Sequence, residues 1–350
     1  MELKSKLILG SINYFLILII TSTGIGLGMH QDTLINPTEI SLEELLETEI
    51  VPINVMGSHI HFAGEWMVGY KKMNMVKEGF LNENNSINND TIFRSYTVAP
   101  TKMSVEMDML EIMYGWNDRL TLMAMLSYEK KSMNHLREDE STYTTRSSGI
   151  GDVQLMGHYL FHQQYPYWLA FMLSMSLPTG SIDQKDNIMG EMKKLPYSMQ
   201  LGLGSVSLIP GMNYIYQAEK FVFGFHSMGT FPISENANEY KLGNQYHLTG
   251  WVNRFLYDWL SFTAIMDGRI FSPIIGSDLD LNVNMVPTAD TANSGGRIIA
   301  LKLGMNTFQN NGKFKGNRLE LEFGFPLYQS VNGFQLGIKN TWSIGWQRTF

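Results

Sequence analysis

The strongest constraint on the fold is an alternation of charged and apolar residues near the C-terminus. In residues 318–325, every second residue is leucine or phenylalanine, and the residues between them are Arg318, Glu320, Glu322 and a glycine. Successive side chains of a strand point to opposite faces, so this stretch predicts a strand with one apolar and one charged face. The charged face is too polar for the core of a sandwich, but it suits a hydrated lumen if the apolar face meets lipid. We therefore predict that Arg318, Glu320 and Glu322 line a lumen.

The same period of two recurs through almost all of the chain beyond Pro52. The alternating segments are bounded by Gly, Asn, Asp and Pro, and they predict about twelve strands. Short connections such as 115–118 alternate with long polar ones, which we place at 76–96, 131–148, 178–199 and 270–296. Short turns at one end and long loops at the other are typical of outer-membrane barrels. We predict an all-β fold, a transmembrane antiparallel up-and-down β-barrel over residues 63–350.

The N-terminus predicts export from the cytoplasm. Lys4 and Lys6 precede an apolar run over 7–20, and small residues follow over 21–28. This order is typical of a secretory signal peptide, which we place at 1–28, and an N-terminal membrane anchor is the alternative. Residues 29–62 then form a periplasmic segment.

A short amphipathic helix is predicted inside that periplasmic segment, over 38–50. Ser41 and Glu44 fit a capping box, and leucines recur on one helical face. The helix could act as a partial plug of the barrel, contact a periplasmic partner, or serve as an inert tether.

Composition narrows the remaining classes of protein. The chain has no cysteine, which excludes disulfides, thiolate metal sites and thiol nucleophiles. No later segment approaches the ~20 consecutive apolar residues of a transmembrane helix. The net charge is −7, and the chain has no basic cluster of the kind that nucleic acid requires, so we predict no nucleic-acid partner.

The last residues of the chain carry a position-specific pattern. Trp342, Ile344 and Trp346 alternate, and the chain ends on Phe350. This ending resembles the C-terminal aromatic signature by which bacterial outer-membrane barrels are handed to the barrel insertion machinery. It departs from that signature at Arg348, where an apolar or aromatic residue is usual. Outer-membrane lipid and the insertion machinery are therefore the expected partners.

Methionines dominate one face of the first predicted strands. They occupy odd positions through residues 101–135, whereas Leu, Ile and Tyr occupy even ones. With a turn at 115–118, the predicted pairing sets Met109 opposite Met123 and Met107 opposite Met125. The predicted lumen-lining residues of this region are Met67, Met73, Met107, Met109, Glu111, Met113, Met123 and Met125.

Three readings of these methionines stay open. Thioethers are soft ligands suited to Cu(I) or Ag(I), they contact aromatic rings favourably, and they also serve as flexible packing residues. The candidate metal ligands are His59, His61, Met107, Met109, Met123, Met125 and His135. The two histidines of the linker could equally be solvated residues with no ligand, and the charged lumen residues could select ions or only neutralise one another.

Catalytic motifs are absent from the sequence. There is no glycine-rich phosphate loop and no HExxH motif. His226 and Ser227 are adjacent, but neighbours on a strand point to opposite faces and cannot form a nucleophile–base pair. We predict no enzyme activity and no cofactor, with an outer-membrane hydrolase as the alternative.

Several stretches together resemble a family of bacterial proteins labelled "transporter". This group is similar to the outer-membrane family named for the meta-pathway of phenol degradation. The resemblance covers Met56 to Phe350. It implies a barrel in the outer membrane of a Gram-negative bacterium and a role in passing a small solute, but no known substrate. The expected function is therefore a channel or transporter for an apolar aromatic compound or a soft metal ion such as copper, and a structural or adhesive barrel is the alternative. The stretches that carry the resemblance are MGSHIHFAGEWMVGYKKMNM, VAPTKMSVEMDMLEIMYGW, TLMAMLSYEKKSMNH, SLPTGSID and MVPTAD.

Overall fold

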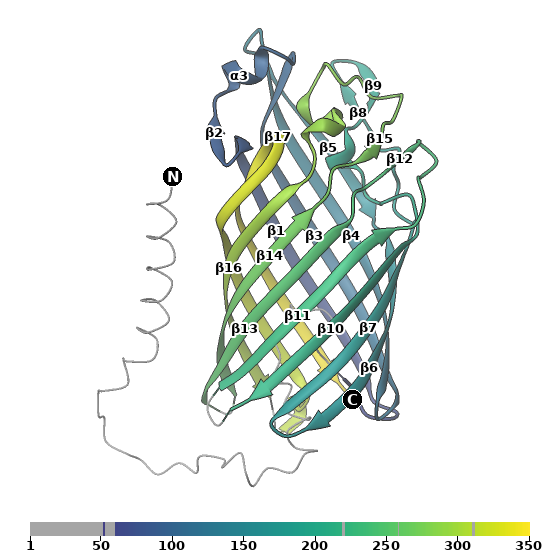
Figure 1. The fold of residues 1–350 in the computed structure, drawn as a ribbon, viewed down its shortest axis with the longest axis vertical. Coiled ribbons are helices and arrows are strands. Elements are labelled where there is room, and N and C mark those ends of the chain that lie inside the picture. The colour runs from purple at the N-terminus through teal and green to yellow at the C-terminus, as the bar shows by residue number, and fades with distance from the viewer. Residues whose placement is uncertain (1–51, 53–59, 219–220, 258, 310–311) are drawn as a thin grey trace, which may run out of the picture. The chain divides into compact units, whose positions relative to one another are not determined.

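A computed structural model describes residues 52, 60–218, 221–257, 259–309 and 312–350. The predicted signal peptide and the predicted helix over 38–50 lie outside the described residues, and both stay predictions. All described residues belong to the unit Glu44–Phe350. This unit forms a β-barrel (Figure 1).

One closed antiparallel sheet forms the wall of the barrel. Within the described residues, eleven strand elements follow one another around the ring in chain order, and the last pairs with the first. In order they are β1 (Trp66–Glu83), β3 (Val98–Asn117), β4 (Leu120–Arg137), β6 (Val153–Gln164), β7 (Tyr167–Leu177), β10 (Ser207–Gln217), β11 (Phe221–Pro232), β13 (Gln245–Tyr257), β14 (Leu260–Phe271), β16 (Gly296–Gln309) and β17 (Asn317–Thr349).

The last element, β17, supplies two strands of the ring. Its residues 317–331 pair with β16, and its residues 331–349 pair with β1. The two arms lie side by side, because Thr349 N donates to Gly316 O at 3.1 Å. Gly333 lies where they meet, with a φ of +61° that favours glycine. A ring of all-antiparallel pairs needs an even number of strands. The two arms supply it, so the predicted barrel of about twelve strands is confirmed.

The two ends of the barrel differ in their connections. At one end the strands are joined by tight turns, and the C-terminus lies there, where Phe350 and Trp66 exchange two backbone hydrogen bonds of 2.9 Å (Figure 1). The short helix η4 (Gly312–Phe314) belongs to this end, since it joins β16 to β17. Long loops occupy the other end. Their elements are β2 (Asn85–Ile87), α3 (Asn89–Phe93), β5 (Thr142–Ile150), β8 (Lys185–Ile188), β9 (Glu191–Lys194), η1 (Tyr197–Met199), β12 (Tyr240–Lys241), β15 (Ile275–Gly276), η2 (Pro287–Ala289) and η3 (Thr291–Asn293).

The strands rise further toward the loop end than the sequence predicts. Residues 76–96 and 131–148 are predicted loops, but β1 runs on to Glu83 and β4 runs on to Arg137. Both extensions keep antiparallel partners, β17 for β1 and β5 for β4. The polar composition of these segments indicates that they are in contact with water. A paired strand that extends beyond the membrane is also in contact with water, so composition alone did not distinguish it from a loop. Among the described residues, no helix is both long enough and apolar enough to cross a membrane.

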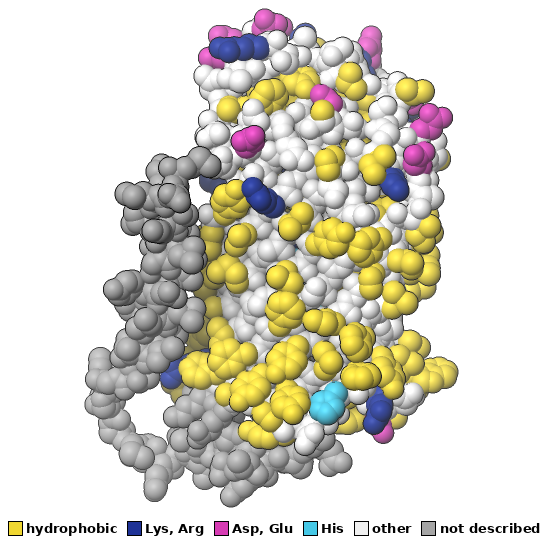
Figure 2. Space-filling view, viewed as in Figure 1, with side chains coloured by type: hydrophobic (Ala, Val, Ile, Leu, Met, Phe, Trp, Pro, Cys, Tyr) yellow, Lys and Arg dark blue, Asp and Glu magenta, His cyan; other side chains and the backbone are white. Residues whose placement is uncertain are grey.

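Alternating burial separates the two faces of the wall. In β17, Arg318 and Glu320 are each 2% exposed, whereas Leu319 and Phe323 are about half exposed. The outward face is therefore apolar, as predicted. Figure 2 shows hydrophobic side chains over the strands and toward the short-turn end, while most of the visible acidic side chains lie at the loop end.

Two loops fold together at the loop end, and we call them the cap: residues 178–206 and 272–295. Lys194 Nζ lies 2.6 Å from Asp278 Oδ2, and this ion pair joins the two loops. Lys194 Nζ also lies 2.8 Å from Asp183 Oδ1 of its own loop. Its hydrogen bond holds the pKa of Asp183 below the usual value. On the underside of the cap, its residues Leu195 and Met199 are fully buried in an apolar cluster that includes Met133 of β4. Apolar packing thus anchors the cap to the barrel, and the Lys194–Asp278 ion pair joins its two loops.

Candidate channel lumen

Methionines from five neighbouring strands pack together on the inward face near the short-turn end. Backbone register sets Met67 beside Met113, Met113 beside Met123, and Met123 beside Met156. Met172 of β7 belongs to the same buried group, and Met125 packs against it. The five buried members are between 0% and 8% exposed. We call this group of six the methionine cluster: Met67, Met113, Met123, Met125, Met156 and Met172.

On β4, methionine occurs only on the inward face. The inward apolar residues of this strand are Met123, Met125 and Met133, whereas the exposed outward ones are Leu122, Ala124, Leu126 and Tyr128. Methionine and leucine are both apolar and similar in size, so burial alone does not explain the difference. What separates them is that a thioether is unbranched and polarisable.

The register of β3 with β4 differs from the predicted one. Met109 lies opposite Ser127 and Met107 opposite Glu129, while Met113 faces Met123. The reason is a tighter turn than predicted, because Asn117 Oδ1 accepts hydrogen bonds from Arg119 N and Leu120 N, both at 2.9 Å. The pairing thereby shifts by an even number of residues. Every side chain keeps its face, but its neighbours change.

Three of the predicted methionines therefore lie away from the cluster. Met73 pairs with Met107, and Met109 pairs with Lys71. All three are half-buried and closer to the loop end than Met113 and Met123 are. Among the described members of the predicted soft-metal set, Met123 and Met125 alone belong to the cluster.

The opposite part of the inward face carries charge, and we call it the charged wall: Asp267, Lys302, Arg318, Glu320 and Glu322. Asp267 of β14 is 2% exposed, and its carboxylate lies 2.8 Å from Lys302 Nζ and 3.0 Å from Arg269 Nε. Lys302 also approaches Glu322 at 3.7 Å. Arg318 donates to Asn306 Oδ1 at 3.1 Å. Buried carboxylates and cations therefore lie side by side and compensate one another.

A hydrogen bond joins the methionine side of the lumen to the charged side. Gln347 Nε2 of β17 donates to Glu111 Oε1 of β3 at 2.8 Å. Between them lies Gly69 of β1, where an added Cβ would stand only 2.3 Å from Glu111 Oε1. Glycine at this position leaves the space that the Glu111 side chain occupies.

The predicted histidine ligands do not come together. His59 lies outside the described residues. His61 N donates to Thr121 Oγ1 at the short-turn end of β4, whereas His135, near the other end, bonds Thr145 Oγ1 at 2.9 Å. The rise of an extended strand separates these two points by about 45 Å. Within the described residues, no group of three or more His, Cys, Asp or Glu could hold a metal ion.

Three other histidines, which sequence reasoning did not select, lie on the inward face. His158 pairs with Met172 beside the methionine cluster. His226 Nδ1 and Asn213 Oδ1 are 2.6 Å apart, and His247 Nε2 lies 3.0 Å from Asp267 Oδ1. Alternation alone could have placed them inside, and the register of the paired strands β11, β13 and β14 sets His226, His247 and Asp267 near one another. Ser227 lies on the other face from His226, as its position predicts.

The predicted insertion signal forms the closing edge of the barrel. Trp342, Ile344 and Trp346 belong to the β17 arm that pairs with β1, and Ile344 is 47% exposed on the outward face. Trp346 Nε1 donates to Asn317 Oδ1 of the other arm at 3.0 Å. Phe350 is 66% exposed at the end of the chain. Recognition of this edge by insertion machinery stays a prediction.

Comparison with known proteins agrees with this architecture. The COG4313 outer membrane channel from Pseudomonas putida F1 is similar with a TM-score of 0.61 at 14% identity, over 86% of this chain and 100% of that one. The CymD monoaromatic hydrocarbon channel gives a TM-score of 0.43 at 10% identity, over 83% and 89%. The KdgM porin gives 0.40 at 9% identity, over 81% and 99%. No curated protein sequence matches.

The family follows from the sequence match itself. Residues 88–265, just over half of the chain, match the family described as "Putative MetA-pathway of phenol degradation". These residues run from α3 through the first half of β14, and so they include every member of the methionine cluster except Met67. The chain therefore belongs to this family, and it is an outer-membrane β-barrel of a Gram-negative bacterium.

Proposed function

We propose that the barrel is a passive channel for a small apolar aromatic solute, which contacts the methionine cluster on its way through the lumen. The observation that carries the proposal is the cluster itself, six methionines contributed by five strands on the inward face. Thioether sulfur makes favourable contacts with aromatic rings, worth about 0.3–1.5 kcal/mol each. Contacts of this size hold a solute without trapping it, which is what conduction requires.

The charged wall supports an uncharged solute. Asp267 has two cationic side chains within 3.0 Å, and Lys302 also neighbours Glu322. Charges that compensate one another in this way leave little net field for a permeating ion. The family description, which refers to phenol degradation, points to the same class of solute.

A soft metal ion is the second candidate, and the same cluster favours it. Cu(I) and Ag(I) prefer sulfur ligands, and one thioether is weak, so a metal path needs several within reach of each other. Met67, Met113, Met123 and Met156 come from four successive strands of the ring and stand in one row of the register.

Two matched variants separate the candidates in proteoliposomes. Replacing Met67, Met113, Met123 and Met156 with Leu removes sulfur but keeps apolarity, whereas Gln at the same positions removes both. For an aromatic solute, we expect flux of phenol to survive the leucine variant and to fall in the glutamine variant. For a soft metal, uptake of Ag(I) falls in both.

Folding of each variant is checked by the faster migration of the unboiled barrel. Absence of phenol flux and Ag(I) flux in the wild-type protein would contradict transport and favour a structural or adhesive barrel. Phenol flux that is equal in all three proteins would show that the cluster has no part in the path.

A further inference from the structure

A groove of about 440 Å³ lies on the barrel surface toward the loop end, and it combines cations with serines. Its outer lining includes Lys130 of β4, Arg146 of β5 and Lys185 of β8, all exposed. Ser104, Ser132, Ser147 and Ser148 also line it. We call this set the serine–cation groove. Small hydroxyl side chains leave room between the cations and add hydrogen-bond donors.

The groove lies directly above the lipid-facing surface. Lys130 is two residues along β4 from Tyr128, which is 42% exposed, and Tyr128 pairs with Ile150, which is 53% exposed. Below these come Leu110 and Leu126, also outward and exposed. Lys130 Nζ stands 5.9 Å from the centre of the Tyr128 ring. An aromatic residue followed by cations marks the level at which lipid tails give way to headgroups.

The acids nearest the groove form their ion pairs and backbone hydrogen bonds with groups other than its three cationic side chains, and one of these acids, Glu106, lies opposite Lys130 in the register. Glu106, which lines the groove, is paired with Lys72 at 3.7 Å, and Asp108 is paired with the same lysine at 3.4 Å. Asp186 accepts from the backbone N of Arg146 at 2.7 Å. In the described part of the chain, no carboxylate forms an ion pair with Lys130, Arg146 or Lys185. The groove therefore presents positive charge toward the headgroup region.

Register places the groove residues within reach of one anionic group. Lys130 pairs with Ser148, and Ser132 pairs with Arg146. Residues opposite each other across two strands lie about 5 Å apart and diagonal ones about 7–8 Å, so Lys130 and Arg146 flank one small site. Arginine with lysine and hydroxyl donors is the combination that suits phosphate oxygens.

We propose that the serine–cation groove binds a phosphate of the glycolipid in the outer leaflet, with Lys130, Arg146 and Lys185 as its cations. The proposal does not depend on the solute that the lumen carries. The bound lipid would fix the level of the barrel in the membrane and hold β8 against β5.

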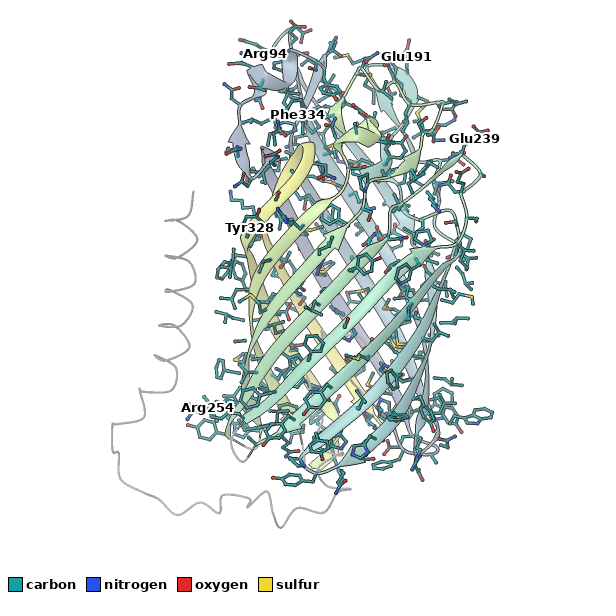
Figure 3. All side chains as sticks on the ribbon, viewed as in Figure 1. Arg94, Glu191, Glu239, Arg254, Tyr328 and Phe334 are labelled. Carbon is teal, nitrogen blue, oxygen red and sulfur yellow. The ribbon has the colours of Figure 1, made fainter. Side chains whose placement is uncertain are left out.

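The test measures the unfolding temperature of the purified full-length barrel in detergent, followed by its migration when unboiled. Diphosphorylated lipid A and its dephosphorylated form are added in parallel. The variant combines Lys130→Gln, Arg146→Gln and Lys185→Gln. Its control, Lys241→Gln with Arg254→Gln and Arg297→Gln, removes the same charge elsewhere. Arg254 lies at the short-turn end (Figure 3), and the guanidinium of Arg297 lies 5.9 Å from the centre of the Tyr328 ring.

Diphosphorylated lipid A should raise the unfolding temperature of the wild-type protein and of the control, but not of the groove variant. Retention of that lipid in native mass spectrometry should be about tenfold weaker for the groove variant. A charge-keeping variant, Lys130→Arg with Arg146→Lys and Lys185→Arg, should bind as the wild type does. Equal binding by the groove variant, equal binding of the dephosphorylated lipid, or the same shift with inorganic phosphate alone would overturn the proposal.

Discussion

The methionine cluster and the charged wall both lie on the inward face of the barrel, but different forces hold them. Within the cluster the side chains meet through apolar contacts, which have no preferred direction and tolerate exchange of one apolar residue for another. In the wall each group depends on a particular partner, as Asp267 does on Lys302 and Arg269. Position inside a barrel therefore does not decide how sensitive a residue is to replacement. The number of specific partners does.

The largest effect is expected from Asp267→Asn. This change keeps the shape of the side chain but leaves Lys302 and Arg269 without their carboxylate, and breaking such a buried group typically costs about 3–5 kcal/mol. The free energy of unfolding in detergent, from urea titration, measures the loss. Met123→Leu in the cluster is the matched control. If both variants lose the same stability, the proposed contrast between the two sides is wrong.

A charge placed on either face of β3 should have opposite consequences. Leu110 is 46% exposed on the outward face, so Leu110→Asp puts a carboxylate into lipid and should cost about 2 kcal/mol and impair insertion. Met109→Asp puts the same group inside, opposite Lys71, where it should be tolerated. The yield of heat-modifiable barrel in the outer membrane reports both. Normal insertion of Leu110→Asp together with failure of Met109→Asp would reverse the two faces.

The sequence predicted the faces well because the alternation is local. A residue such as Glu320 points inward or outward according to its position in the strand, whatever lies far away in the chain. For the same reason the wrong register of β3 with β4 did no harm to the assignment of faces. The error of an even number of residues left Met123 inside, but it gave Met123 the wrong partner.

The neighbours within the lumen could not be predicted in this way. Whether a turn takes two residues or four depends on one side chain, Asn117, and the sequence GWND fits both. His61 precedes β1 and contacts the short-turn end of β4, whereas His135 lies near the other end of β4. His226 and His247 lie on the paired strands β11 and β13, and the register of that pair sets their rings 6.2 Å apart. A contact that depends on the register between two strands has no signal within either strand.

An intermediate effect is expected where the two sides of the lumen meet. Gln347→Leu removes the hydrogen bond to Glu111 and should reduce the free energy of unfolding by about 1–2 kcal/mol, because a half-buried carboxylate loses a donor. Thermal unfolding in detergent measures it. Glu111→Gln in the same background should recover part of the loss, since a neutral amide needs that donor less. A further loss on combining the two changes would contradict this role for Gln347.

The smallest effect on stability is expected from single leucine replacements within the methionine cluster. Met113 of β3 and Met156 of β6 both lie opposite Met123 of β4 in the register. Each can therefore be replaced without changing the strand that carries the other. Leucine keeps volume and apolarity, and swaps of this kind usually cost less than about 1.5 kcal/mol. Met113→Leu and Met156→Leu should therefore unfold close to the wild type in the urea titration that is used for Asp267→Asn.

Because the two residues touch the same neighbour, the loss of unfolding free energy in the double variant measures how closely the cluster is packed. A loss near the sum means that each side chain adapts independently, as flexible thioethers do. A loss well above the sum, approaching that of Asp267→Asn, would mean that the methionines are fitted to one another as specifically as the ion pairs, and the difference between the two sides would disappear.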